Sequence, residues 1–242
     1  MSDLLRIEKE GVVAVMYWQH APQNQFNDVF LQEIVDALKE IEADRSIKAL
    51  VITSGVEKFF STGLALEWLM QTAATNPPAI LDYFILLNEF MVTVTGFAKP
   101  VIGAITGHCV AMGAIIGACM DYRFMTNERG FVRTPEMEIN IPFLPGMNAI
   151  LKEIMPPASW RDFAYTADKF TGEQAMAMGY IDKLCPPDEL LPTAIEFANK
   201  LGGFKMSTYA AIKRENRRLS LDIMKKEDPD AIRNFVAKFT GG

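Results

Sequence analysis

The sequence predicts an α/β fold, because strand patterns alternate with helical patterns along most of its 242 residues. Apolar, β-branched runs typical of buried strands lie at residues 12–18, 48–53, 101–105 and 122–126. A full helical pattern separates the first two runs, and this order implies a right-handed parallel crossover. Half of the residues are hydrophobic, which is enough for one large core.

Capping residues and apolar spacing predict the helices between these strands. Asn27 or Asp28 caps the first helix, whose apolar residues recur at helical spacing. A short helical pattern follows the second strand. Pro77 and Pro78 then mark the start of a long apolar helix that ends near Phe97, since proline is favoured in the first helical turn.

The second half of the chain is mostly helical. Residues 114–120 form a short buried helix, and Thr171 caps a later one. One further strand is expected near Ile181–Leu184. The remaining residues have an amphipathic helical pattern, of the kind that packs on a partner subunit or back on its own core. We therefore expect a core over residues 1–185 and a helical C-terminal region over residues 186–242.

Charge and composition argue against several classes of function. The net charge is −6 and no strong basic run stands out, so nucleic-acid binding is not predicted. With only two histidines, a multi-histidine metal site is excluded, and no metal is expected. Residues 101–120 are apolar and about as long as a membrane span, but Thr106, His108 and the glycines indicate strand, loop and buried helix. No membrane association is expected.

Cysteine content and the chain ends bear on location. Three cysteines without a CxxC spacing are typical of small buried thiols in a reducing compartment. Residues 2–10 are too polar for a signal peptide, and the last residues do not form the peroxisomal SKL signal. We expect a cytoplasmic protein.

The most informative segment is residues 99–124, KPVIGAITGHCVAMGAIIGACMDYRF, followed twelve residues later by Glu136 in RTPEMEINIPF. A turn that opens a helix presents free N–H groups and the positive end of the helix dipole. A lone carboxylate facing such a turn can move a proton beside a carbonyl whose developing charge the amides stabilise. The alternative is an ordinary strand-to-helix turn, with Glu136 an exposed carboxylate after Pro135.

Three loop segments in order resemble the crotonase family, the enoyl-CoA hydratase/isomerase superfamily. They are KFFSTGLALEWL, KPVIGAITGHCVAMGAIIGACMDYRF and RTPEMEINIPFLPG, and FTGEQAMAMGYIDKL matches the family's late helix–strand pattern. The resemblance implies a ββα spiral core followed by a helical C-terminal trimerisation region. It also implies an acyl-CoA thioester substrate, no separate cofactor because coenzyme A is part of the substrate, and a homotrimer or a hexamer (dimer of trimers).

By this resemblance, the backbone N–H groups of Thr62 and Met112 hold the thioester oxygen. The family's glycine run is replaced here by Ala-Met-Gly, so the bulk of Met112 should reshape the pocket. The loop Lys58–Gly63 is expected to hold coenzyme A by backbone contacts, with Lys58 near a phosphate or simply on the surface. The expected substrate-binding residues are Lys58, Phe60, Ser61, Gly63, Leu64, Gly113, Ile115 and Phe143.

Family hydratases use two carboxylates, and this chain matches only one of their positions. Ile115 stands at the first position and Glu136 at the second. A single base can take a proton from C2 and return it at C4. The resemblance therefore implies the Δ3,Δ2-enoyl-CoA isomerase reaction with Glu136 as catalytic residue, in an apolar pocket that includes Ile139 and Ile141 and raises its pKa. Glu138 is the alternative base.

Two departures from the family pattern keep other functions open. Met112 and Ala65, where the family often has an aspartate, motivate a catalytically silent acyl-CoA-binding protein. A different crotonase-family reaction on a CoA thioester, by a hydratase, lyase or thioesterase, is the other alternative. Asn24 matches a family asparagine and is expected to order its loop.

Overall fold

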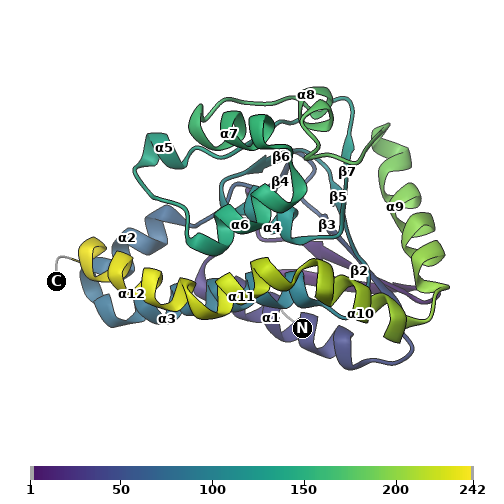
Figure 1. The fold of residues 1–242 in the computed structure, drawn as a ribbon, viewed down its shortest axis with the longest axis horizontal. Coiled ribbons are helices and arrows are strands. Elements are labelled where there is room, and N and C mark those ends of the chain that lie inside the picture. Colours follow the sequence, from purple (N-terminus) through teal and green to yellow (C-terminus); the bar gives the residue numbers. More distant parts are fainter. Residues whose placement is uncertain (1–2, 241–242) are drawn as a thin grey trace.

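The computed structural model describes residues 3–240, which form a large sheet flanked by helices and a small second sheet (Figure 1). The large sheet has six strands in the order β1-β2-β3-β5-β7-β9. β1 pairs antiparallel with β2, and all other neighbours are parallel, as the α/β prediction requires. The strands are β1 (Leu5–Glu10), β2 (Val13–Trp18), β3 (Ala49–Ser54), β5 (Val101–Ile105), β7 (Tyr122–Thr126) and β9 (Lys183–Cys185).

The second sheet has three parallel strands in the order β4-β6-β8. They are β4 (Phe59–Ser61), β6 (His108–Val110) and β8 (Val132–Arg133). The chain passes from a strand of the large sheet to one of the small sheet, and then into helix, three times in succession. This repeat is the expected ββα spiral. The strand pattern of the sequence does not predict the small sheet, because strands of two or three residues show no periodicity.

Helices cover both faces of the large sheet (Figure 1). They are α1 (Asp28–Ala43), α2 (Leu66–Thr75), α3 (Pro77–Gly96), α4 (Met112–Cys119), α5 (Glu136–Ile139), α6 (Pro145–Ile154), α7 (Pro157–Tyr165), α8 (Gly172–Ala177), α9 (Pro187–Gly202), α10 (Met206–Asn216), α11 (Arg218–Lys226) and α12 (Asp228–Phe239). Alternate residues of β2 face two cores: Val15 packs in the core that α9 covers, and Met16 in the larger core under α1, α3 and α4. Burial on both faces explains the nearly continuous apolar strands.

Two caps confirm predicted helix starts. The Asn27 side-chain oxygen accepts the backbone N–H of Phe30 at 2.9 Å, so Asn27 rather than Asp28 is the N-cap of α1. Thr171 caps α8 and forms a capping box with Gln174. The edge strand β1 was not among the predicted strands, because its residues are mostly exposed and it shows no apolar run.

Helix α3 is long and apolar enough, by length and composition, to cross a membrane. Half of its most apolar window is buried inside the protein, and the core helix of a soluble protein passes the same test. Its buried residues face α1, α11 and α12. The helix therefore gives only weak support to a membrane span.

The C-terminal helices return across the core and take part in it. α11 and α12 lie against α3 and α6 (Figure 1). Asp228 is fully buried, and its Oδ1 accepts the backbone N–H of Gly146 at 2.7 Å, which ties the start of α12 to the start of α6. Met224, Ile232 and Val236 belong to the same apolar core as the strands and helices before residue 185. The helices α11 and α12 therefore pack back on that core.

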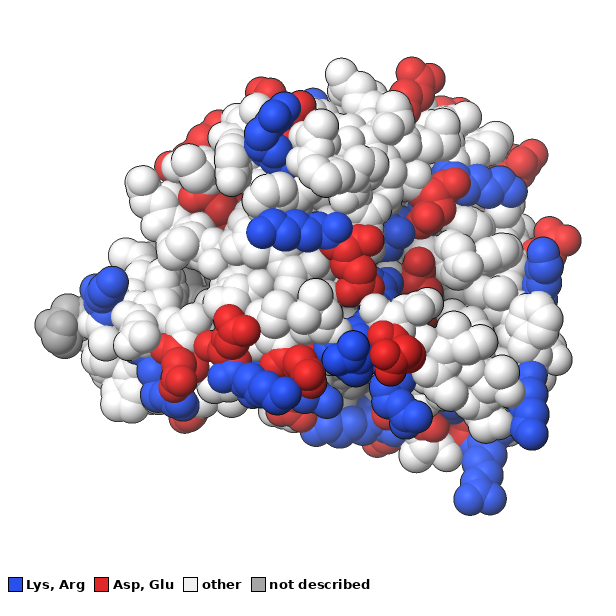
Figure 2. Space-filling model, viewed as in Figure 1, with Lys and Arg blue, Asp and Glu red and all other residues white. Residues whose placement is uncertain are grey.

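Charged groups on the face in Figure 2 are mixed in sign, with no patch of one sign. Two ion pairs are nearly buried and hold the C-terminal helices to the core. Lys213 on α10 lies 2.8 Å from Asp121, and Arg217 lies 2.8 Å from Glu153 on α6. Each charge is paired, as burial requires.

Candidate active site

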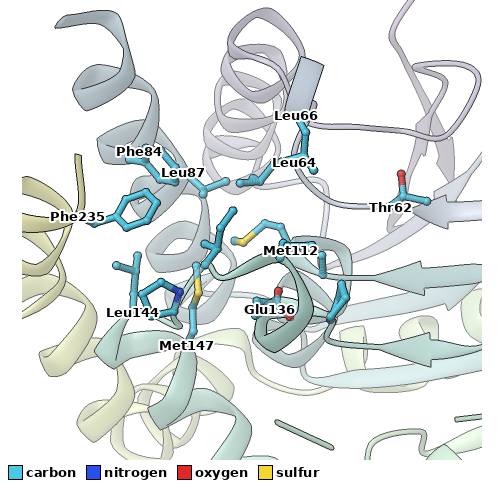
Figure 3. Close-up of a pocket in the computed structure, with 15 residues that line it drawn as sticks. Thr62, Leu64, Leu66, Phe84, Leu87, Met112, Glu136, Leu144, Met147 and Phe235 are labelled. Carbon is cyan, nitrogen blue, oxygen red and sulfur yellow. The ribbon is translucent and has the colours of Figure 1, made fainter. Parts of the chain in front are cut away.

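A mostly apolar pocket lies where the carboxyl ends of β4, β6 and β8 meet α3, α6 and α12 (Figure 3). Because parallel strands end at the same edge, residues that follow them in three distant segments come together there. The cavity volume is about 120 Å³. It is lined by Thr62, Leu64, Leu66, Phe84, Leu87, Ala111, Met112, Pro135, Glu136, Ile139, Ile141, Pro142, Leu144, Met147 and Phe235.

Glu136 is the only ionisable side chain among these lining residues. It begins the short helix α5, directly after Pro135, and its carboxyl group points into the pocket (Figure 3). Its Oε2 is buried and has no hydrogen-bond partner among the described residues. Burial raises its pKa to about 7, and the hydrogen bond to its own backbone N–H and the charge of Arg133 oppose this only in part. The interpretation of Glu136 as an exposed helix-start carboxylate is therefore wrong.

The alternative base, Glu138, points elsewhere. It is exposed, it does not line the pocket, and its carboxylate pairs with the Arg133 guanidinium at 2.5 Å. Arg133 also donates through Nε to the carbonyl of Ala167 at 2.6 Å, which holds the guanidinium in place. The pair keeps the charge of Glu138 outside the cavity, and so Glu136 is the better candidate base of the two.

The backbone N–H groups of Leu64 and Met112 lie beside the pocket and have no acceptor among residues 3–240. Met112 opens α4 after Ala111, whose φ of 51° is unusual for a residue other than glycine. Gly63 has a φ of 88°, and a Cβ on it would lie 2.9 Å from the Met112 nitrogen. Glycine therefore lets the two loops approach, with the Met112 amide beside the loop that carries Leu64.

Thr62 differs from expectation. Its backbone N–H donates to the carbonyl of Gln23 at 3.1 Å, so this amide is already engaged within the protein. The Thr62 residue still lines the pocket, and its hydroxyl lies 3.0 Å from the side-chain oxygen of Gln23. The sequence motif predicts the Thr62 N–H as a donor to the thioester oxygen, but in the structure it is the Leu64 N–H of this loop that is free.

Several residues expected to bind substrate lie outside the pocket. Phe60 is fully buried, because its side chain points from β4 into the core, where its ring lies 4.9 Å from that of Trp18. Ser61 is also buried, and its hydroxyl donates to the carbonyl of Asn24 at 2.7 Å. Asn24 in turn donates to the carbonyl of Phe60 at 3.0 Å, in agreement with its expected loop-ordering role.

Of the other residues expected to bind substrate, some line the pocket and others lie in the core or at the surface. Ile115 is fully buried in the core on α4, and Phe143 packs half-buried against that core without lining the pocket. Lys58 is exposed and does not line the pocket either. Gly113 acts through its backbone, since a Cβ there would lie 2.7 Å from the Ser61 carbonyl oxygen. Leu64, Ile139 and Ile141 line the pocket as expected.

The apolar wall opposite the loops was missed by the sequence reasoning. It is formed by Phe84 and Leu87 on α3, Leu144 and Met147 at the start of α6, and Phe235 on α12. Each lies in an ordinary amphipathic or apolar helical pattern, which looks the same for core packing and for a pocket wall. No group of three or more His, Cys, Asp or Glu suited to a metal ion occurs among the described residues.

The sequence and the fold of this chain are both similar to those of known proteins. The sequence model of the enoyl-CoA hydratase/isomerase family matches residues 8–235. The chain is 26% identical to a crotonyl-CoA hydratase of Syntrophomonas wolfei, over 81% of this chain and 74% of that protein. It is also 26% identical to the peroxisomal enoyl-CoA delta isomerase 2 of Arabidopsis thaliana, over 86% of this chain and 90% of that protein. A solved structure described as an enoyl-CoA isomerase superposes with a TM-score of 0.87 at 27% identity, covering 97% of this chain and 99% of that one. A second structure of the same Mycobacterium tuberculosis protein, described as a probable enoyl-CoA hydratase, superposes with a TM-score of 0.89 at 25% identity, covering 98% of each chain.

Proposed function

Because this chain belongs to the enoyl-CoA hydratase/isomerase family, we propose that it moves the double bond of a 3-enoyl-CoA thioester to the 2-position. One observation carries the proposal: Glu136, whose Oε2 is buried and unpartnered, is the only ionisable group among the residues that line an otherwise apolar pocket. Hydratases and isomerases both occur among the relatives at similar identity. The choice between them therefore rests on the chemistry of this site.

We assign the oxyanion donors to the N–H groups of Leu64 and Met112, replacing Thr62, whose N–H is engaged. The two unpartnered amides flank Gly63, so one oxygen between the loops can accept from both. Glu136, as carboxylate, takes a proton from C2 of the substrate. The electron pair of that C–H bond forms a dienolate, and its charge on the thioester oxygen is stabilised by the amides, each worth about 3–4 kcal/mol in comparable sites.

The same carboxyl group then returns the proton to C4, and the remaining double bond lies between C2 and C3. No atom is gained or lost, which suits a site with one acid–base group. A pKa of about 7 lets Glu136 serve as base and then as acid near neutral pH. Hydration needs a second carboxylate to position water. The matching position holds the fully buried Ile115, so no acid is supplied there.

The test is turnover of 3-hexenoyl-CoA by the wild type, by Glu136→Gln and by Glu138→Gln. We expect Glu136→Gln to lower kcat by about 10²- to 10⁴-fold, the usual contribution of a general base. Glu138→Gln is the matched control, because it neutralises a carboxylate two residues away that faces solvent, and it should stay close to wild type.

Equal rates in the wild type and Glu136→Gln would remove Glu136 from the mechanism. A 3-hydroxyacyl-CoA formed from 2-hexenoyl-CoA at a rate above the isomerisation rate would identify a hydratase. Tight binding of hexanoyl-CoA with no product from either substrate would instead identify a binding protein.

A further inference from the structure

We infer that the facing rings of Phe84 and Phe235 close the far end of the pocket and restrict this chain to short acyl groups, of about four to six carbons. The inference rests on the proposed function for its acyl-CoA substrate. It adds a substrate class and two specificity-determining residues, which come from helices 151 positions apart in the sequence.

The two rings lie opposite the reacting end of the site. Phe84, Leu87 and Phe235 lie at one end of the pocket, away from Glu136 and Thr62 (Figure 3). The ring centroids of Phe84 and Phe235 are 5.2 Å apart at an interplanar angle of 74°, an edge-to-face contact. An acyl tail that begins at the amides and Glu136 and follows the apolar wall therefore meets this pair of rings.

The aromatic pair is braced on both sides. The Phe84 ring packs edge-to-face on Tyr83 at 5.4 Å, and the Tyr83 hydroxyl donates to the carbonyl of Phe26 at 2.8 Å. The Phe235 ring stacks on Phe239 at 5.6 Å. Helix α12, which carries Phe235, is itself tied to α6 through Asp228. By contrast, Met112 and Met147 on the pocket walls are flexible and can adjust the width of the pocket.

The cavity volume sets the expected chain length. An apolar cavity of about 150 Å³ in another protein holds benzene, which has six carbons. In proportion, the volume of about 120 Å³ here holds about five carbons. A longer tail must displace a braced ring or leave the pocket past Leu66, which is 42% exposed at the rim.

The experiment measures the affinity and turnover of the wild type across a chain-length series. Dissociation constants are determined by calorimetry for butanoyl-, hexanoyl-, octanoyl- and decanoyl-CoA, and kcat/KM for the 3-enoyl-CoA of each length. While the tail stays inside an apolar pocket, each added methylene should tighten binding about fourfold. We expect this gain to stop at six carbons in the wild type, with kcat/KM at least tenfold lower at ten carbons than at six.

In the variants Phe84→Ala and Phe235→Ala, affinity should continue to increase with chain length up to eight or ten carbons. The chain length with the highest kcat/KM should increase in the same way. Phe235→Leu is the milder variant, for use if the alanine variant does not fold. Phe197→Ala is the matched control, because Phe197 is on α9 against the other face of the sheet, and it should keep the wild-type profile.

A wild-type affinity that continues to tighten fourfold per methylene from six to ten carbons would overturn the inference. The inference would also be overturned if Phe84→Ala and a folded Phe235 variant both showed the wild-type dependence of affinity and kcat/KM on chain length. The saturated acyl-CoA ligands have no double bond to move, so their dissociation constants test the limit on chain length independently of isomerase activity. If binding stops improving at six carbons and no 3-enoyl-CoA is isomerised, then the isomerase assignment fails and the limit on chain length stands.

Discussion

Replacing Glu136 with Gln should make the protein more stable at neutral and higher pH while it removes activity. In the wild type, burial moves the pKa of this carboxyl from 4.5 to about 7 in the folded state. The folded protein therefore keeps the proton to higher pH than the unfolded chain does. As the pH rises from about 4.5 to about 7, the free energy of unfolding falls, because the unfolded chain gives up its proton first.

The size of this effect follows from the pKa change. A difference of one pKa unit corresponds to about 1.4 kcal/mol, so a pKa moved from 4.5 to about 7 corresponds to about 3 kcal/mol. Gln has nearly the shape of the protonated acid and does not ionise. Below pH 4.5 the two proteins should have similar stability, and above pH 7 Glu136→Gln should be more stable by up to about 3 kcal/mol.

Urea unfolding of the wild type and of Glu136→Gln between pH 4.5 and pH 8 measures this difference. Glu138→Gln is the control, because its carboxylate is exposed and paired with Arg133 outside the cavity. A difference between the wild type and Glu136→Gln that does not change with pH would refute the reasoning, since it would mean that the carboxyl is solvated in the folded protein.

The remaining predictions concern catalysis, packing and assembly. The kcat/KM of the wild type should rise with pH around a midpoint of about 7, as Glu136 loses its proton; a flat profile in the same range would exclude it as the base. Gly63→Ala should lower kcat at least tenfold, because the new Cβ would lie 2.9 Å from the Met112 nitrogen and shift the amides; unchanged kcat would refute their role. Asp228→Ala should lower the free energy of unfolding by about 1–2 kcal/mol by uncapping α6, whereas Asp228→Asn should lose less; equal losses would contradict the cap. Light scattering should give the mass of a trimer or hexamer, and a monomer would contradict the expected assembly.

Local sequence patterns predicted most of the large sheet and its helices. The buried runs that became β2, β3, β5 and β7 are long enough to show strand character, and the cap at Asn27 is encoded within four residues. The small sheet escaped prediction, although its strand ends build the pocket. Its pairing is between segments about 25 to 50 residues apart, and short strands leave no local pattern.

The candidate base was identified from its motif, and its environment was anticipated only in part. Glu136 was chosen because one acid matched the family pattern where two are usual, and the structure buries it. The Thr62 N–H, assigned from its motif, already has an acceptor in the structure, and a motif does not show which N–H in a tight loop is engaged in this way. That acceptor, the carbonyl of Gln23, lies 39 residues earlier. Phe60 and Ser61 do not line the pocket for a related reason, since their side chains point from the strand into the core.

The order of residues was therefore enough to indicate an α/β protein of this family with one candidate acid, because repeating apolar patterns and short motifs are properties of neighbouring residues. It did not reveal which amides are free, how far Glu136 is withdrawn from water, or that Phe84 meets Phe235. Those properties arise when segments distant along the chain pack together, since burial and hydrogen-bond partners belong to the assembled core and not to any single stretch of sequence.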